Sequence, residues 1–180
     1  MRRVLLAFVL ALCGLAPVQA APPNAPKRIV SLDYCADQFV LGIADRSQIA
    51  ALSYGADKDD SYYRGRALGL GRTRGSLEET LALQPDLIVR NWGGGFSAEA
   101  TYARFHIPVL TLGDSATFAE ARAQLLQAAH AFGQDARGAA MAKDLDARLA
   151  MLSSQTPSTR PRATPGCGAR PRSPVVREGS

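Results

Sequence analysis

The chain has 180 residues, a length that suits one domain or one and a half. Of these residues, 47% are hydrophobic and 21% are charged, and the formal net charge is +5. The positive charge lies at the two ends: without the arginines at positions 2 and 3, and without the five arginines and one glutamate of 156–180, residues 21–155 carry a net charge of −1. This net charge excludes a nucleic-acid role argued from charge. The same range holds a single cysteine, Cys35, which excludes a disulfide framework within the fold.

An apolar run near the N-terminus predicts a secretory signal peptide over residues 1–20. Two arginines precede the apolar run 4–12 and the A-x-A-like site 18–20 follows it, so we expect the exported chain to begin at Ala21. Cys13 offers a lipoprotein alternative, but a large leucine precedes it where a lipidated cysteine requires a small residue. No later apolar run is long enough to span a bilayer. We therefore predict a soluble periplasmic protein, without membrane insertion after cleavage.

The first part of the exported chain reads as strand, helix, strand and loop. The apolar run Arg28–Leu32 predicts a buried strand, and Asp33 can cap the helix that follows over 35–41. Residues 48–53 predict a second strand. Residues 54–75 are polar, aromatic and rich in glycine, which indicates a loop.

The next segment, SLEETLALQPDLIVRNWGGG, begins as a helix and ends in glycines. Ser76 with Glu79 three residues later forms the S-x-x-E pattern of a capping box, and Pro85 closes this short helix. Residues 86–90 then predict a strand. Trp92, the only tryptophan of the chain, follows that strand directly.

The remaining chain continues the alternation of helices and strands. We expect a helix over 96–105, a strand over 107–112, a helix over 117–132 that places Phe118 on its apolar face, and a further helix over 135–152. Alternating strands and helices predict an α/β fold: a parallel sheet flanked by helices on both faces.

The C-terminal end differs in composition from everything before it. Residues 156–180 contain five prolines and five arginines but few apolar residues, which indicates disorder, and we assign 153–180 to this tail. One interpretation is a frameshifted or truncated end. The alternative is a basic tail that binds nucleic acid or a membrane.

Aromatic side chains follow three of the predicted strands. Trp92 and Gly93 come after the strand 86–90, Tyr54 comes after 48–53, and Tyr34 comes after Asp33 at the end of the first strand. Because ligands of parallel α/β sheets bind beyond the carboxyl ends of the strands, this aromatic rim predicts a site for a large, flat or partly apolar ligand. The alternative is that the aromatic rings pack on each other or on a region that is missing.

Two stretches resemble a known family. The segments PKRIVSLDYCADQFVLGIADRSQIAALS and SLEETLALQPDLIVRNWGG are similar to periplasmic substrate-binding proteins that deliver metal chelates, such as cobalamin, ferric siderophores or haem, to ABC importers. The resemblance covers about residues 27–152 and implies two α/β lobes joined by one long helix, with the ligand between them. By this resemblance, 21–134 is the N-terminal lobe, 135–152 begins the connecting helix, and the second lobe is absent.

The resemblance also implies roles for single residues. Glu78 matches the acid that docks such proteins onto the importer permease, although any first-turn glutamate favours a helix dipole. Tyr54 and Trp92 match aromatic residues that contact the ligand. Where a cobalamin binder would carry another tryptophan, this chain has Arg72 and Arg74, which suit an anionic ligand and favour a ferric siderophore unless they belong to a solvated loop.

The sequence does not point to catalysis or to a resident cofactor. It contains no G-x-S-x-G motif and no plausible pair of cysteine and histidine. His106 and His130 lie on separate predicted elements, so we expect no protein-bound metal, and any metal would arrive within its chelate. The predicted function is an impaired importer component, monomeric, whose partners are a metal chelate and a permease. The alternative is a single-lobe, non-enzymatic module that works with another polypeptide.

Overall fold

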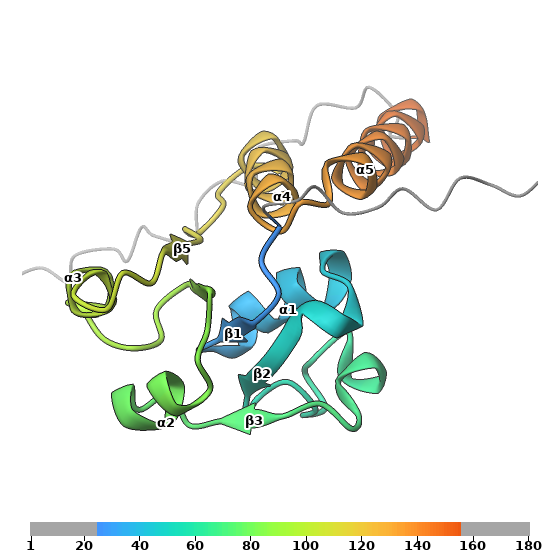
Figure 1. Cartoon of the computed structure of the whole chain (residues 1–180). Coiled ribbons are helices and arrows are strands. Elements are labelled where there is room, and N and C mark those ends of the chain that lie inside the picture. Colours follow the sequence, from blue (N-terminus) through green and yellow to red (C-terminus); the bar gives the residue numbers. More distant parts are fainter. Residues whose placement is uncertain (1–24, 156–180) are drawn as a thin grey trace, which may run out of the picture. The chain divides into compact units, whose positions relative to one another are not determined.

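The computed structural model describes residues 25–155 (Figure 1). The predicted signal peptide 1–20 and the proline- and arginine-rich segment 156–180 lie outside the described residues. The chain divides into two compact units, the first ending at Ala142 and the second beginning at Lys143. In the described part of the second unit, all residues are helical.

The first unit is built on a parallel sheet of five strands, in the order β3-β2-β1-β4-β5. The strands are β1 (Ile29–Ser31), β2 (Ile49–Ser53), β3 (Arg72–Thr73), β4 (Leu87–Arg90) and β5 (Val109–Thr111). The helices are α1 (Tyr34–Ile43), α2 (Leu77–Ala82), α3 (Ala98–Ala103), α4 (Phe118–Ala131) and α5 (Asp135–Gln155), with 3-10 turns η1 (Arg46–Gln48) and η2 (Arg64–Ala67). The predicted α/β class is confirmed.

The two faces of the sheet carry separate hydrophobic clusters. Ile29 and Val89 belong to a cluster that includes residues of α1 and α4, whereas their neighbours Val30 and Ile88 belong to a second cluster with Tyr102 of α3. Adjacent residues of a strand point to opposite faces, so this division follows directly from the uninterrupted apolar runs of β1 and β4. The prediction that helices cover both faces is therefore confirmed.

The predicted loop 54–75 was wrong in part, because it contains β3 and η2. Parallel pairing with β2 defines β3, with Leu52 opposite Arg72, and the Leu52 N–H donates to the Gly71 carbonyl oxygen at 3.0 Å. A strand of two residues between glycines leaves no apolar pattern to detect.

Other elements differ from prediction at their ends. Helix α3 is shorter than 96–105 and leaves Phe96 fully exposed, and Phe118 is 65% exposed instead of lying on the apolar face of α4. Helix α5 begins at Asp135 as predicted but continues to Gln155, three residues into the segment assigned to the tail. Cys35, the single cysteine of the fold, is half-buried.

Both predicted helix caps form. The Asp33 carboxylate accepts the Ala36 N–H at 2.9 Å, and the Ser76 hydroxyl accepts the Glu79 N–H at 3.3 Å. The capping box of α2 is one-sided, because the Glu79 carboxylate accepts instead from the backbone N–H of Arg74 at 2.8 Å. Within residues 25–155, the helices are too short or too polar to cross a membrane.

Candidate functional site

A pocket of about 400 Å³ lies where β1, β2, β3 and β4 end. The carboxyl ends of parallel strands meet at one edge of the sheet, which brings together side chains that are far apart in the sequence. The pocket is lined by Leu32, Asp33, Tyr34, Ser53, Tyr54, Gly55, Thr73, Arg74 and Trp92. Four of the residues predicted to bind ligand, Tyr34, Tyr54, Arg74 and Trp92, are therefore gathered in one place.

The three aromatic side chains of the pocket remain half-exposed. Tyr34 is 47% exposed, Tyr54 is 49% exposed and Trp92 is 58% exposed. The rings of Tyr34 and Trp92 meet edge to face, with centroids 6.0 Å apart. This contact fixes their mutual orientation but leaves apolar ring surface available to a ligand.

Arg74 supplies a positive charge at the rim. Its guanidinium carbon lies 5.3 Å from the centroid of the Tyr54 ring, a cation–π distance. Among the salt bridges of the described residues, none involves Arg74. An exposed guanidinium that rests on an aromatic ring and has no carboxylate partner can receive an anionic group of a ligand.

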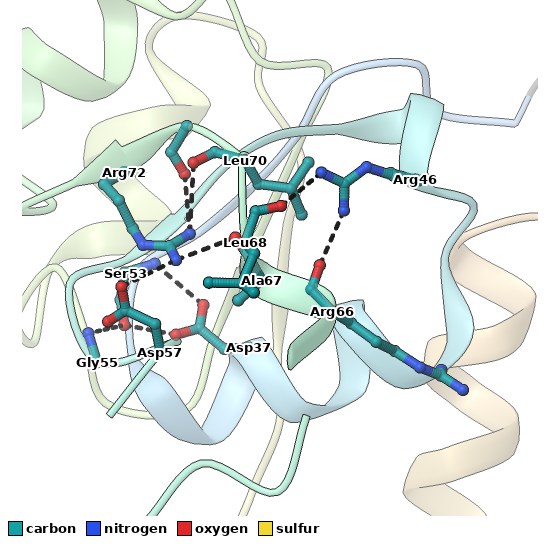
Figure 2. Close-up of polar contacts among 11 residues, drawn as sticks. Asp37, Arg46, Ser53, Gly55, Asp57, Arg66, Ala67, Leu68, Leu70 and Arg72 are labelled. Carbon is teal, nitrogen blue, oxygen red and sulfur yellow. Dashed lines mark hydrogen bonds and ion pairs between the residues drawn. The ribbon is translucent and has the colours of Figure 1, made fainter. Parts of the chain in front are cut away.

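Arg72 lies elsewhere. Its guanidinium forms a salt bridge with Asp57 at 3.3 Å and donates to the Ala67 carbonyl oxygen at 3.0 Å (Figure 2). The hydrogen bond from Arg72 also lowers the pKa of the Asp57 carboxyl. These contacts hold the connection between β2 and β3 together, so the structure separates Arg72 from Arg74 and from the pocket lining.

Gly93 and Glu78 also lie outside the pocket lining. Gly93 is buried against the end of β1, where an added Cβ would stand 2.6 Å from the Leu32 carbonyl oxygen. Glycine is therefore required here for contact within the fold. Glu78 is exposed in the first turn of α2.

Three titratable groups, Tyr34, Cys35 and Asp37, lie in the pocket lining or directly beside a residue that lines it. Burial raises the pKa of the Cys35 thiol, and the neighbouring Cys35 raises the pKa of the Tyr34 hydroxyl, so both groups are neutral at pH 7. Asp37 is fully buried below Ser53, whose hydroxyl donates to its carboxylate at 2.5 Å (Figure 2). Burial raises the pKa of Asp37, although the hydrogen bonds from Ser53 oppose this shift.

Two charged residues that support the site, Asp33 and Arg90, were not predicted to do so from the sequence. Asp33 was identified only as a helix cap, but its second carboxylate oxygen accepts three backbone N–H groups of the segment after β4. Arg90, treated as part of a strand, is buried and donates to three carbonyl oxygens of the same segment. The available signal was a charged residue at the end of an apolar strand, since a buried charge needs partners.

Within residues 25–155, the histidine, cysteine, aspartate and glutamate side chains form no group of three or more that could hold a metal ion. His130 contacts Asp135 at 3.0 Å on the surface.

Several solved structures share this fold. The periplasmic vitamin B12 binding protein BtuF of Vibrio cholerae is 24% identical, with a TM-score of 0.57 over 72% of this chain and 50% of that chain. The periplasmic heme-binding protein RhuT from Roseiflexus sp. RS-1 is 20% identical, with a TM-score of 0.59 over 72% and 50%. An ABC-type Fe3+-hydroxamate transport system structure from Saccharomonospora viridis is 18% identical, with a TM-score of 0.54 over 72% and 51%.

The chain spans about half the length of the solved structures it matches. A comparison with curated proteins found no match. The family model described as periplasmic binding protein matches residues 29–176, which extends past the range 27–152 over which the sequence resemblance is evident. Since this model matches most of the chain, the protein belongs to the periplasmic binding protein family.

Proposed function

We propose that this protein is the periplasmic solute-binding component of an ABC importer for a metal chelate of the ferric-siderophore or cobalamin type. The observation that carries the proposal is the pocket at the carboxyl edge of the sheet, which combines three half-exposed aromatic rings with the guanidinium of Arg74. Proteins of the same fold have been described as binding vitamin B12 and heme.

The chemistry of the pocket favours a chelate that is both flat or partly apolar and anionic. The rings of Tyr34, Tyr54 and Trp92 offer apolar surface, and Arg74 offers a bidentate donor for a carboxylate or another anionic oxygen. The neutral Cys35 thiol and Tyr34 hydroxyl add no charge. We therefore favour a ferric siderophore, with haem and cobalamin as the alternatives.

Binding by the described residues should be weak. The pocket is an open wall of one sheet edge, and the chain spans about half the length of the structures it matches. Without a second wall, a ligand loses roughly half of its contact area, and every 1.4 kcal/mol of lost binding free energy weakens affinity about tenfold. We propose that this wall binds a ligand weakly on its own, that the exposed Glu78 docks onto basic residues of the permease, and that the chain performs no catalytic step.

The experiment is a titration of Trp92 fluorescence in the purified protein with haemin, cobalamin and several ferric siderophores. Free N-acetyltryptophanamide corrects for light absorbed by each chelate. Saturable quenching that is weakened by Arg74→Ala, but not by Arg64→Ala at an exposed arginine outside the pocket lining, would support the proposal. Folded protein that shows no saturable response to any chelate would refute it.

The variant Arg72→Ala separates the two predicted arginine roles. Because Arg72 contacts Asp57 and Ala67 instead of the pocket, its loss should lower the melting temperature while leaving the affinity for a chelate nearly unchanged. A large loss of affinity at unchanged stability would place Arg72 in the ligand site after all.

A further inference from the structure

The segment that carries Trp92, residues 91–95 and here called the Trp loop, has little regular structure of its own. It follows β4 directly, and both Gly94 and Gly95 adopt positive φ angles, 79° and 78°. A glycine-rich segment of this kind has many accessible conformations when it is unsupported. Two buried charged side chains supply the support.

Asp33 holds the Trp loop through its N–H groups. One oxygen of its carboxylate, Oδ2, accepts from Asn91 at 2.7 Å, from Trp92 at 3.1 Å and from Gly93 at 2.9 Å. The Asp33 side chain is 1% exposed, so these hydrogen bonds replace its contacts with water. A carboxylate oxygen shared by three consecutive N–H groups fixes the backbone at Trp92 itself.

Arg90 holds the same loop through its carbonyl groups. Its guanidinium donates to Gly93 at 2.6 Å, to Gly95 at 3.0 Å and to Trp92 at 3.2 Å. The planar guanidinium spreads its five N–H donors over a rigid fork, whereas a lysine presents its three donors from a single nitrogen on a flexible stem. The Trp loop is thus bound on its donor side by Asp33 and on its acceptor side by Arg90.

Asp33 also connects the Trp loop to Tyr34. Its other oxygen, Oδ1, accepts the Ala36 N–H and caps α1, whose first residue is Tyr34. The Tyr34 ring in turn meets the Trp92 ring edge to face. One buried carboxylate therefore sets the positions of two aromatic side chains of the pocket.

We infer that Asp33 and Arg90 are positioning residues that hold Trp92 in its ligand-binding orientation before any ligand arrives. The inference rests on the proposed function for its consequence, which is affinity, but not for its structural part. A preordered loop does not have to be immobilised on binding, so the entropy lost at that step is smaller. Neither side chain needs to touch the ligand for this effect.

The test uses Trp92 as its own reporter in the ligand-free protein. We would compare Arg90→Met with Arg64→Met, the same substitution at an exposed arginine, by acrylamide quenching and fluorescence anisotropy. With the clamp removed, the anisotropy should fall, and the quenching constant should rise by up to about 1.7-fold, the ratio of full exposure to the 58% exposure of Trp92. Arg90→Lys, which keeps the charge but not the planar fork of donors, should give an intermediate effect. It replaces Arg90→Met in the comparison if Arg90→Met does not fold.

The outcome in ligand-free protein decides the inference. A folded Arg90 variant with the anisotropy and quenching of its Arg64 control would overturn it, whether or not any chelate binds. If wild-type protein binds a chelate, the folded Arg90 variant should bind it about two- to tenfold more weakly. If no chelate binds while the loop loosens as expected, the proposed function fails and the positioning roles stand.

Discussion

Replacing Gly93 by alanine should disturb the pocket from its buried side. The new Cβ would stand 2.6 Å from the Leu32 carbonyl oxygen and 2.8 Å from both the carbonyl carbon and the Cβ of Leu32. Ordinary contacts of this kind begin near 3.4 Å, so the backbones must separate by about 0.8 Å. Neither backbone can move freely, because Leu32 donates to the Val89 carbonyl oxygen at 3.0 Å across the sheet.

The expected magnitude follows from two contributions. Forcing a methyl group into packed surroundings costs about 1–3 kcal/mol. A shift of this size would also stretch the hydrogen bond between the Gly93 N–H and Asp33, now 2.9 Å, and a lost hydrogen bond to a charged group costs about 1.5–3 kcal/mol. We expect the free energy of unfolding to fall by about 2.5–6 kcal/mol. The melting temperature should then fall by about 10–24 °C, at roughly 4 °C per kcal/mol.

The assay is urea denaturation followed by circular dichroism, with Gly65→Ala as the matched control. An added Cβ at Gly65 meets nothing within 4 Å, so that variant should retain wild-type stability. Trp92 emission should change in Gly93→Ala alone, because the Trp loop shares the displaced backbone. If the two variants had equal unfolding free energies, the close approach of Gly93 and Leu32 could not be a feature of the folded protein.

Three further predictions concern stability alone. Burial raises the pKa of Asp37, so its contribution to stability is fully present below the ordinary pKa of 3.8 and is lost as pH rises through the raised value. A hydrogen bond from Arg137 of α5 lowers the pKa of Asp45, so the contribution of Asp45 to stability is present above pH 3.8 and is lost as pH falls through the lowered pKa. The variants Asp37→Asn and Asp45→Asn should therefore change the slope of unfolding free energy against pH in opposite directions. The buried Thr80 hydroxyl has no hydrogen-bond partner, so Thr80→Val should be neutral or stabilising by up to about 1 kcal/mol in urea denaturation. Thr73→Val loses a 3.0 Å hydrogen bond from the Gly75 N–H and should destabilise the protein by about 1 kcal/mol. Phe132→Ala removes a fully buried ring and should cost about 3–5 kcal/mol, and a melting temperature within 2 °C of wild type would contradict the placement of Phe132 in the core.

The strands of the core could be read from the sequence because burial dictates their composition. The strands β1, β2 and β4 are apolar on both faces, as a parallel sheet between helices requires. Each was predicted within two residues of its observed bounds. The strand β3 escaped prediction because it is defined by its partner. Arg72 pairs through its backbone with Leu52, and nothing within 54–75 reveals that partner.

The pocket shows the same division between local and long-range information. Tyr34, Tyr54 and Trp92 could be predicted to meet, since each follows a strand and parallel strands end at one edge. The two arginines could not be told apart. Arg72 and Arg74 are two residues apart and chemically identical, but one is engaged by Asp57 and the other lies over Tyr54. Only the fold of the connection between β2 and β3 decides which guanidinium faces the pocket.

The order of the aromatic wall and the strength of its binding have separate physical origins. Asp33, Arg90 and the Trp loop that they bind all belong to the first unit. The hydrogen bonds between them hold Trp92 in place from within the first unit. What a second wall would add is contact area with the ligand, which determines how much apolar surface is removed from water. We therefore expect this wall alone to be rigid and selective for the shape and charge of its ligand, while its affinity is limited by the area it can cover.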